Sequence, residues 1–288
     1  MKRYDFTISS DARPGRLFAL TARMLPDVPE YALREAFRKR DVKVNGMRVG
    51  MDAQVEPGAE VCIYTRDTEA KTIPIIYQDE CVLVAVKPAG VSCEPDAQGG
   101  RTLTQLLHAQ MLTNDPGARE PLLCHRLDNP TEGLILLAKT PDVQDTMQNA
   151  FRERRIHKTY ICIVRGTPRP AQRILEDYLI KDAKQARVKV VANERSGAKN
   201  IVTEYSVLQS GECARLAIDL HTGRTHQIRA HMAYIGHPLL GDDQYGDREF
   251  NKQHKVRKLM LCAAKLTFSL EGPFAYLNEK VFECAPTF

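Results

Sequence analysis

A short polar island interrupts a hydrophobic stretch near the middle of the chain. Residues 122–140 read LLCHRLDNPTEGLILLAKT, so His125, Arg126 and Asp128 lie between two apolar runs. Buried charges are costly unless they are paired, so the island is either a structural ion pair or an active site. In an extended strand, Arg126 and Asp128 would face one side and His125 the other. A carboxylate in such a place can act as a nucleophile or stabilise developing positive charge.

Histidines recur at five-residue intervals later in the chain, which raises the question of a metal site. His221, His226 and His231 follow this spacing, with His237 beyond them. Two ligands on one helix are better placed three or four residues apart, and no HExxH arrangement is present. The eight cysteines are scattered, and no two of them are separated by two residues, the spacing of a zinc knuckle or a redox site. The sequence therefore predicts no metal site.

Strands mixed irregularly with helices must position these residues. Apolar runs predict strands at 133–138, 160–164, 201–208, 214–220 and 259–268, and helical patterns fall at 103–112, 141–153 and 225–235. Their irregular order indicates an α+β domain with a mixed, mainly antiparallel sheet and flanking helices, over residues 73–288. No glycine-rich phosphate loop occurs, so no nucleotide cofactor is expected.

Residues 1–66 have a different pattern and predict a small separate α/β module. Two helical segments precede DVKVNGMRV, in which Asn45-Gly46 suits a tight hairpin because both residues tolerate positive φ. The order resembles the RNA-binding module named after a small-subunit ribosomal protein. That resemblance implies RNA contacts by the cations of the second helix and the strand after it, Arg34, Arg38, Lys39, Arg40 and Lys43. Solvated helix faces are the alternative interpretation. Residues 67–72 are polar and predict a linker.

The composition is that of a globular intracellular protein. Among 288 residues, 41 Lys+Arg against 36 Asp+Glu leave a net charge of +5, compatible with a polyanionic partner. The N-terminus lacks the apolar core of a secretory signal, and no apolar run approaches the length that spans a bilayer. We expect a cytoplasmic monomer with reduced cysteines and no membrane contact.

Five segments in order resemble the RNA pseudouridine synthases of the RluA type. They are VLVAVKPAGV, HRLDNPTEGLILLAKT, HKTYICIVRG, HTGRTHQIRAHMAYIGHPLLGDDQYG and KLMLCAAKLTF. Together with the N-terminal module, the resemblance covers nearly the whole chain, to about Phe268. It implies isomerisation of uridine to pseudouridine, a reaction that needs neither a redox step nor a second substrate, and therefore no cofactor or metal.

The resemblance also assigns roles to residues. Asp128 is the implied catalytic carboxylate, Arg229 its ion-pair partner, and Tyr160 the residue that stacks on uracil and could help remove the proton from carbon 5. Arg126 takes the space of the flipped-out base, and Leu261 forms the apolar wall of the pocket. The same segments place Lys158 and His125 against the substrate.

Two positions depart from the family pattern, and the substrate has more than one candidate. Glu132 stands where many members have Ser, and Cys262 where the closing strand usually has His. The module and the catalytic segments together are typical of members that act on large-subunit (23S) ribosomal RNA. Transfer RNA is the alternative substrate, and a catalytically silent ribosome assembly factor is the alternative function. The intact set Asp128, Tyr160 and Arg229 favours the enzyme.

Overall fold

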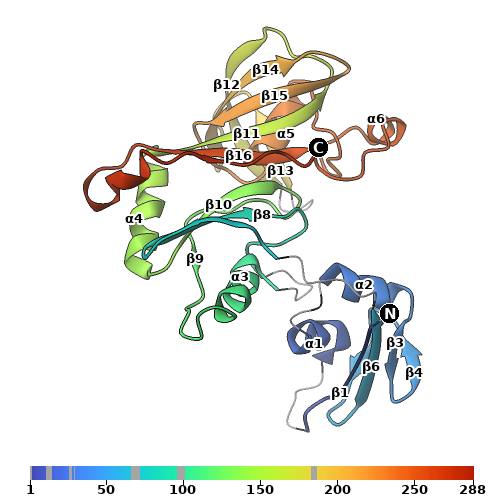
Figure 1. Cartoon of the computed structure of the whole chain (residues 1–288). Coiled ribbons are helices and arrows are strands. Elements are labelled where there is room, and N and C mark those ends of the chain that lie inside the picture. Colours follow the sequence, from blue (N-terminus) through green and yellow to red (C-terminus); the bar gives the residue numbers. More distant parts are fainter. Residues whose placement is uncertain are drawn as a thin grey trace. The chain divides into compact units, whose positions relative to one another are not determined.

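The computed structural model describes residues 2–10, 15–25, 28, 30–65, 72–95, 101–182 and 187–288. The chain divides into two compact units, one of Met1–Ile73 with Ser92–Ala118 and one of Pro74–Val91 with Arg119–Phe288 (Figure 1). The predicted linker lies outside the described residues except for Thr72. The predicted domain borders stay a prediction.

The first unit places two helices on one face of a small sheet (Figure 1). Four antiparallel strands follow the order β1-β6-β3-β4, and β2 pairs with β5 in a separate ribbon. The elements are β1 (Lys2–Thr7), β2 (Gly15–Arg16), α1 (Leu17–Met24), α2 (Glu30–Arg38), β3 (Val42–Val44), β4 (Met47–Val49), β5 (Gln54–Val55), β6 (Glu60–Thr65) and α3 (Leu103–Leu112).

Local sequence accounts for this unit. Leu33, Ala36 and Phe37 recur on one face of α2 and are almost completely buried in the core. Asn45 and Gly46 have φ values of 48° and 82°, as the predicted β3–β4 hairpin requires. At α3, Thr102 and Gln105 form a capping box that fixes the start of the helix.

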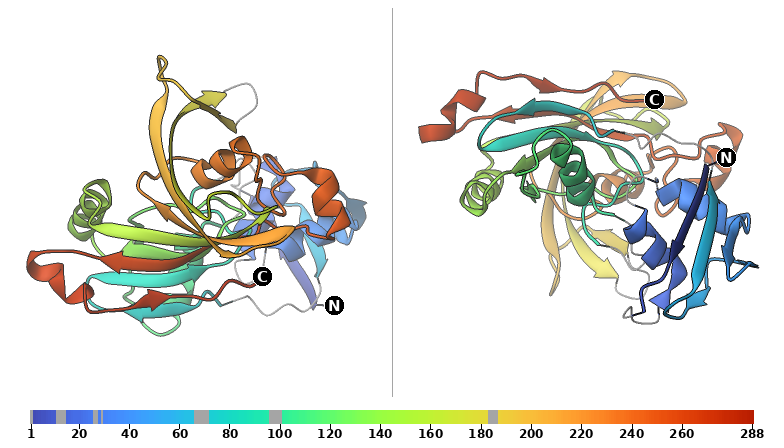
Figure 2. Two further views of the ribbon diagram at one scale, coloured as in Figure 1. Left: turned by 90° about the horizontal axis from the view of Figure 1, so that it is seen from above. Right: turned by 60° about the horizontal axis from the view of Figure 1, so that its bottom comes forward.

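The second unit is built on one mixed sheet of eleven strands (Figures 1 and 2). Its main path runs β13-β12-β14-β15-β11-β16-β10-β8-β7, with β17 beside β16 and β9 beside β10. The strands are β7 (Ile75–Gln78), β8 (Val82–Lys87), β9 (Leu122–Leu123), β10 (Glu132–Ala138), β11 (Ile156–Arg165), β12 (Gln172–Asp182), β13 (Arg187–Val191), β14 (Lys199–Gln209), β15 (Cys213–Leu220), β16 (Leu261–Phe268) and β17 (Phe282–Glu283). Of these pairings only β10–β16 is parallel, so the predicted α+β class with a mainly antiparallel sheet is confirmed.

The helices described in the second unit are α4 (Pro141–Arg152), α5 (Gln227–Tyr234), α6 (Arg248–Gln253) and the 3-10 helix η1 (Gly272–Leu277), of which α4 and α5 pack against the sheet. Thr140 caps α4, and Pro141 opens it; α4 packs against β10 and β11. Helix α5 packs against β13 and β14 (Figure 2). No helix among the described residues is long and apolar enough to cross a membrane.

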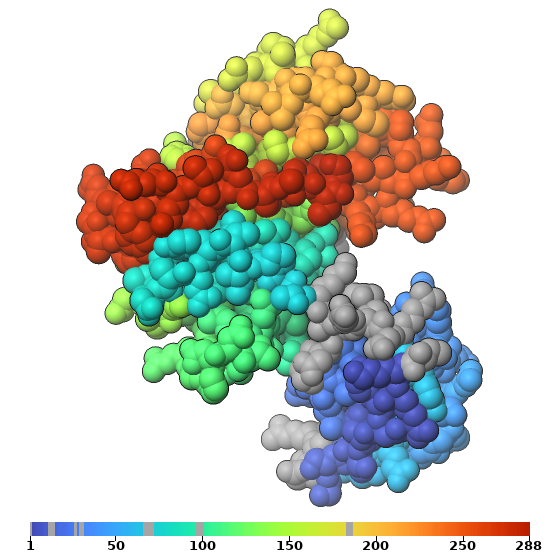
Figure 3. All heavy atoms as spheres, viewed as in Figure 1, coloured from blue at the N-terminus to red at the C-terminus, as the bar shows by residue number. Residues whose placement is uncertain are grey.

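Two close approaches fix the strands that carry the candidate site. Gly133 has φ of 119°, and a Cβ there would lie 2.4 Å from the Ala263 carbonyl oxygen, so β10 can meet β16 only with glycine at this position. The C-terminal segment packs along β7 and β8 (Figure 3). There the Tyr276 hydroxyl donates to Asp79 at 2.6 Å, and the Phe282 ring packs edge-on against Tyr77.

Candidate active site

The polar island lies in the connection between β9 and β10. The side-chain alternation considered for residues 125–128 requires an extended strand, but the strand pairing ends at Leu123 and resumes at Glu132. The connection is tied down by Lys87, whose fully buried ammonium donates to the Pro88, Val91 and Asn129 carbonyl oxygens at 3.0, 2.8 and 3.1 Å. An ammonium that satisfies three carbonyls can hold a loop rigidly without a helix or strand. Asp128 is thereby presented half-buried beside an exposed Arg126.

Arg229 on α5 is the buried centre of the site. Its guanidinium Nη1 lies 3.5 Å from Asp128 Oδ2, which brings the predicted pair together. Its stronger partner is Asp242, which accepts from Nε at 2.7 Å and from Nη2 at 2.9 Å. Burial disfavours both charges, but the pairing outweighs it: the pKa of Asp242 is lowered and that of Arg229 raised. This fork-on-carboxylate bond orients the guanidinium toward Asp128.

His226 also faces the Asp128 carboxylate. It starts α5 in a left-handed conformation, with φ of 54°, and its Nε2 lies 3.8 Å from Asp128 Oδ2. Its Nδ1 lies 3.0 Å from the Tyr245 hydroxyl, which accepts from the Val188 N–H at 2.9 Å. Since that hydroxyl accepts from Val188, it can donate to Nδ1, and we assign the imidazole hydrogen to Nε2. Burial lowers the pKa of His226, only partly offset by Asp128.

Tyr160 and Leu261 form the apolar side of the site. They lie on the neighbouring strands β11 and β16, and both belong to a hydrophobic cluster that also contains Leu127 of the polar island and Ile228 and Met232 of α5. Tyr160 is only 5% exposed. Burial, followed by the Asp128 charge, raises the pKa of Tyr160 and keeps the phenol neutral. The structure thus groups the predicted tyrosine and leucine near the carboxylate.

His125 and Lys158 are anchored to another neighbour, Phe151 of α4. The His125 ring packs against Phe151 with centroids 4.7 Å apart and planes tilted by 56°, and the Lys158 ammonium lies 5.1 Å from the centroid of that phenyl ring. His125 Nε2 accepts from the Leu136 N–H. Burial lowers the pKa of His125 well below its ordinary value of 6.5. Burial lowers the pKa of Lys158 to about 8. Among the described residues, neither side chain is within hydrogen-bond or ion-pair distance of Asp128.

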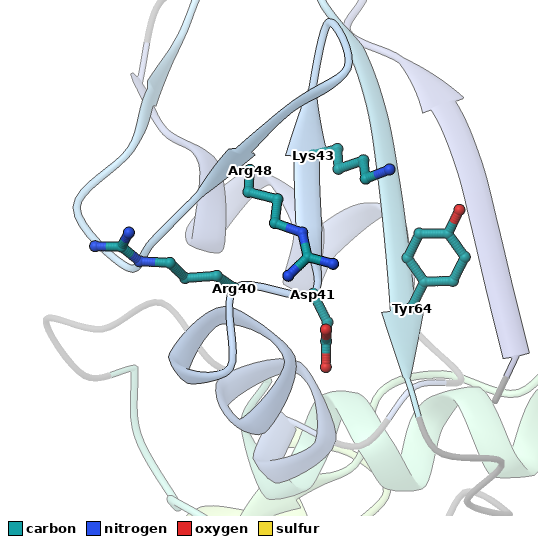
Figure 4. Close-up of a pocket in the computed structure, with 5 residues that line it drawn as sticks. All are labelled: Arg40, Asp41, Lys43, Arg48 and Tyr64. Carbon is teal, nitrogen blue, oxygen red and sulfur yellow. The ribbon is translucent and has the colours of Figure 1, made fainter.

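The predicted RNA-contacting cations all lie in the first unit. Lys39 pairs with Glu35 at 2.6 Å, Arg34 lies over the Phe18 ring, and Arg38 is exposed. Arg40 and Lys43 instead line a pocket of about 330 Å³ together with Asp41, Arg48 and Tyr64 (Figure 4). The helix cations and the pocket cations therefore have different surroundings.

The two positions that depart from the family pattern hold the C-terminal segment. Glu132 and Cys262 are register partners on β10 and β16. The Glu132 carboxylate accepts from the Thr287 N–H at 2.8 Å and from its hydroxyl at 2.7 Å. The Cys262 sulfur lies 3.7 Å from that of Cys284. Both departures thus serve packing behind the site.

Sequence reasoning missed several residues that shape the site. Asp242 stood inside the GDDQYG segment, but nothing local distinguishes it from its neighbour Asp243, whose side chain is 87% exposed. The histidines weighed as metal ligands have protein partners: His221 bonds to Glu204 at 3.0 Å and His231 to Asp177 at 3.0 Å. His226 and Tyr245 could have been singled out only by knowing that α5 and the loop after it converge on Asp128.

Comparison with known proteins gives this site its family. Residues 81–234 match the family described as RNA pseudouridylate synthase. The ribosomal large subunit pseudouridine synthase C of Escherichia coli K12 is 31% identical over 286 residues, which cover 92% of this chain and 88% of the relative. The enzyme of the same name from Vibrio vulnificus is 32% identical over 282 residues, covering 91% of this chain and 87% of the relative.

Solved structures agree. The human RNA pseudouridylate synthase domain containing 4 is 25% identical with a TM-score of 0.57, covering 71% of this chain and 91% of its own. The human RNA pseudouridylate synthase domain containing 1 is 23% identical with a TM-score of 0.59, covering 77% of this chain and 86% of its own, and supports the fold. The resemblance drawn from the five ordered segments is therefore confirmed: the chain belongs to the RNA pseudouridylate synthase family.

Proposed function

We propose that this RNA pseudouridine synthase modifies uridine in large-subunit (23S) ribosomal RNA and uses Asp128 as its essential carboxylate. The reaction breaks the bond between the sugar and nitrogen 1 of uracil, turns the base, and joins carbon 5 to the sugar. Carbon 5 then loses its hydrogen as a proton, and nitrogen 1 carries a hydrogen in the product. The substrate assignment rests on relatives whose names specify the large ribosomal subunit.

The observation that carries the catalytic proposal is the asymmetric surroundings of the Asp128 carboxylate. Arg229 at 3.5 Å and His226 at 3.8 Å both face Oδ2. Among the described residues, no hydrogen bond or ion pair goes to Oδ1. A carboxylate held on one oxygen leaves the other to meet the sugar, either as a nucleophile or as a base toward a sugar proton. The Arg229–Asp242 bond keeps that orientation fixed before the substrate arrives.

The apolar side of the site suits a flipped-out uracil. Extruding a base costs a few kcal/mol, and stacking on an aromatic ring recovers about 1–3 kcal/mol. Tyr160 provides such a ring, and Leu261 lies next to it on β16. The exposed Arg126 is two residues before Asp128, where its side chain can fill the space that the base leaves in the RNA. A neutral Tyr160 can relay the proton from carbon 5 only if its own hydroxyl proton passes to Asp128 or to solvent in the same step.

Tritium release tests the proposal directly. RNA labelled with tritium at carbon 5 of uridine loses the label only when that carbon sheds its hydrogen after forming its new bond. Wild type and Asp128→Asn are supplied with unmodified 23S ribosomal RNA and, separately, with transfer RNA. We expect release from ribosomal RNA by wild type and a loss of at least about 10³-fold in the variant.

Three results would contradict the proposal. Substantial release by Asp128→Asn removes the catalytic role of the carboxylate. Release from transfer RNA alone replaces the substrate. Binding of ribosomal RNA without release from either RNA favours a silent assembly factor. Equal thermal unfolding of the two proteins is the control, because asparagine has the shape of aspartate and the side chain is only partly buried.

A further inference from the structure

Helices α1 and α2 pack on one face of the small sheet in the first unit, and among the described residues no helix covers the other face (Figure 1). Along β6, Val61, Ile63 and Thr65 point into the core against α1 and α2, whereas Cys62 and Tyr64 point to the other side. Register places Arg3 of β1 beside Tyr64, and Lys43 of β3 beside Cys62. Arg48 of β4 follows beside Lys43. An aromatic ring therefore stands on an open sheet face with cations on the strands around it.

The backbone of Tyr64 is held in place, and two cations lie near its ring. Its backbone N–H donates to the Asp41 carbonyl oxygen at 2.9 Å, which fixes the end of β6 against the turn before β3. The Lys43 ammonium lies 5.9 Å from the ring centroid, and the Arg3 guanidinium carbon lies 5.8 Å from it. In the view of Figure 4, Lys43 extends toward the ring and the Arg48 guanidinium lies above Asp41. Arg40 points away from the ring.

The charges of this pocket are not balanced. Arg3 has its own carboxylate, Asp5, at 2.8 Å. Arg40, Lys43 and Arg48 have no carboxylate within ion-pair distance among the described residues. With Asp41 as the one acidic residue in the lining, three cations against one carboxylate leave an excess of two positive charges in the lining of the pocket.

We propose that this pocket, which we call the Tyr64 pocket, binds one unpaired nucleotide of the RNA, with its base stacked on Tyr64 and its flanking phosphates on Lys43 and Arg48. Base stacking on an aromatic side chain within a positively charged groove is the general way in which proteins hold single-stranded nucleic acid. The Asp41 carboxylate at the rim can accept from a base N–H. The inference rests on the proposed function, because it gives the RNA a second point of attachment on the first unit.

The chemistry of the pocket favours a nucleotide over an acidic peptide. Lysine and arginine alone would serve either polyanion, but a peptide carboxylate does not use the half-buried ring between these cations. A base does, because it stacks on the ring while its phosphates neutralise the unpaired charges. The pocket volume of about 330 Å³ suits one small ligand group rather than a helix or a duplex.

A single tryptophan can report on this pocket. The chain contains no tryptophan, so Tyr64→Trp introduces one fluorophore at the proposed site. The full-length variant is titrated with a six-nucleotide oligoadenylate, whose bases cannot react in a uracil-specific active site, and with a blunt RNA duplex. We expect saturable quenching by the single strand, little by the duplex, and weakening of about fivefold or more when Lys43→Gln is added. Polyglutamate of equal charge is the competing probe.

The functional consequence is measured with ribosomal RNA in the tritium assay. Tyr64→Ala should raise KM by about fivefold or more while kcat stays within about twofold, and Tyr64→Phe should behave like wild type. Circular dichroism checks folding, which a half-buried side chain on an open face should not control. Absent quenching, or equal quenching by polyglutamate, overturns the inference. If quenching is absent but wild type still releases tritium, only the inference about the Tyr64 pocket is wrong. If quenching is normal but no tritium is released, only the proposed function is wrong.

Discussion

The same charge has two different surroundings in this molecule. Arg229 on α5 is 2% exposed, and its guanidinium is locked by two hydrogen bonds to the buried Asp242. Lys43 and Arg48 of the Tyr64 pocket lie on an open sheet face with no carboxylate within ion-pair distance among the described residues. Burial makes the first cation a fixed part of the protein, whereas the others keep their charge available for a partner.

The contrast separates geometry from affinity. A buried and paired guanidinium contributes little net attraction, because desolvation offsets it, but it holds one oxygen of Asp128 in one direction. Exposed cations hold nothing in place, yet each RNA phosphate that they neutralise releases counterions. Changes near Arg229 should therefore affect stability and kcat, and changes in the Tyr64 pocket should affect KM and its dependence on salt.

The largest effect is expected from breaking the buried pair. Asp242→Ala leaves the Arg229 charge without its main partner and should lower the free energy of unfolding by about 3–5 kcal/mol, with a parallel loss of kcat. Urea unfolding measures the first and tritium release the second. Asp243→Ala is the matched control, because its side chain is 87% exposed and should cost little. Equal destabilisation by both changes would contradict the assigned anchor.

The pairing also predicts how this stability depends on pH. The pKa of Asp242 is lowered in the folded protein below its ordinary value of 3.8. A group with a lowered folded pKa stabilises the protein above its unfolded pKa and loses that contribution as the pH falls through the folded pKa. The difference in unfolding free energy between wild type and Asp242→Asn should be constant above about pH 5 and shrink below pH 4.

The next effect sharpens the role of His226, whose Nε2 faces the Asp128 carboxylate at 3.8 Å. His226→Asn keeps a residue that tolerates the left-handed backbone but cannot reach the carboxylate, and kcat should fall about 10–100-fold with little change in KM. His226→Gln, which can place an amide N–H near the Nε2 position, should recover part of the loss. Tyr245→Phe should cost less than His226→Asn, because it removes only the hydroxyl that fixes the tautomer. A purely structural role would show no recovery by glutamine.

What could be predicted from the sequence follows the range of the interactions. The core strands, α3, and the Asn45-Gly46 hairpin depend on neighbouring residues, and their patterns are visible locally. The Asp128–Arg229 pair joins residues 101 positions apart and was reached only through the family resemblance. Strands β12 and β13 were not predicted. In β12, Ile174 is 52% exposed, so its apolar residues do not mark one buried face.

The sequence predicted residues that make up the candidate site but not which of its residues pair most strongly. Segment order predicted Asp128, Tyr160, Arg229 and Leu261 as site residues; the structure pairs Asp128 with Arg229 and places Tyr160 and Leu261 in one cluster, and their catalytic roles stay a prediction. It could not show that Asp242, rather than Asp128, is the main partner of Arg229, because burial of one of two adjacent aspartates is decided by the loop after α5. Backbone anchoring by Lys87 was equally invisible, since its partners are carbonyl groups that every residue carries.

A smaller effect is expected at Lys158, which stands between the two kinds of cation. It is half-buried beside Phe151 without a carboxylate partner among the described residues, and its pKa is about 8. If its ammonium contacts an RNA phosphate, KM should rise by about three- to tenfold as the pH increases from 7 to 9. Lys158→Arg should flatten that rise, because arginine stays charged.

Between about pH 8 and 10.5, the Lys158 contribution to folding stability should increase with pH, whereas its contribution to RNA binding should decrease. The pKa of Lys158 falls from 10.5 in the unfolded chain to about 8 in the folded protein. Between these values the unfolded chain binds more protons, so the contribution of this group to stability increases with pH. A KM that rises while thermal stability does not fall therefore reports on binding. A KM that stays flat in wild type would remove Lys158 from the RNA contact.

The smallest effect is the one that tests the comparison itself. Each phosphate contact made by an unpaired cation should contribute about 0.7–0.9 to the slope of log affinity against log salt concentration. Arg48→Gln should reduce that slope by about this amount, because among the described residues Arg48 has no carboxylate partner that would compete with the phosphate. Arg3→Gln should reduce the slope less, because Arg3 is already paired with Asp5. The slope is measured from filter binding of ribosomal RNA between about 50 and 200 mM salt. Equal slopes for the two variants would mean that an ion pair on this face is as available to RNA as a free cation. The distinction between cations that hold geometry and cations that bind phosphate would then apply only to the buried Arg229.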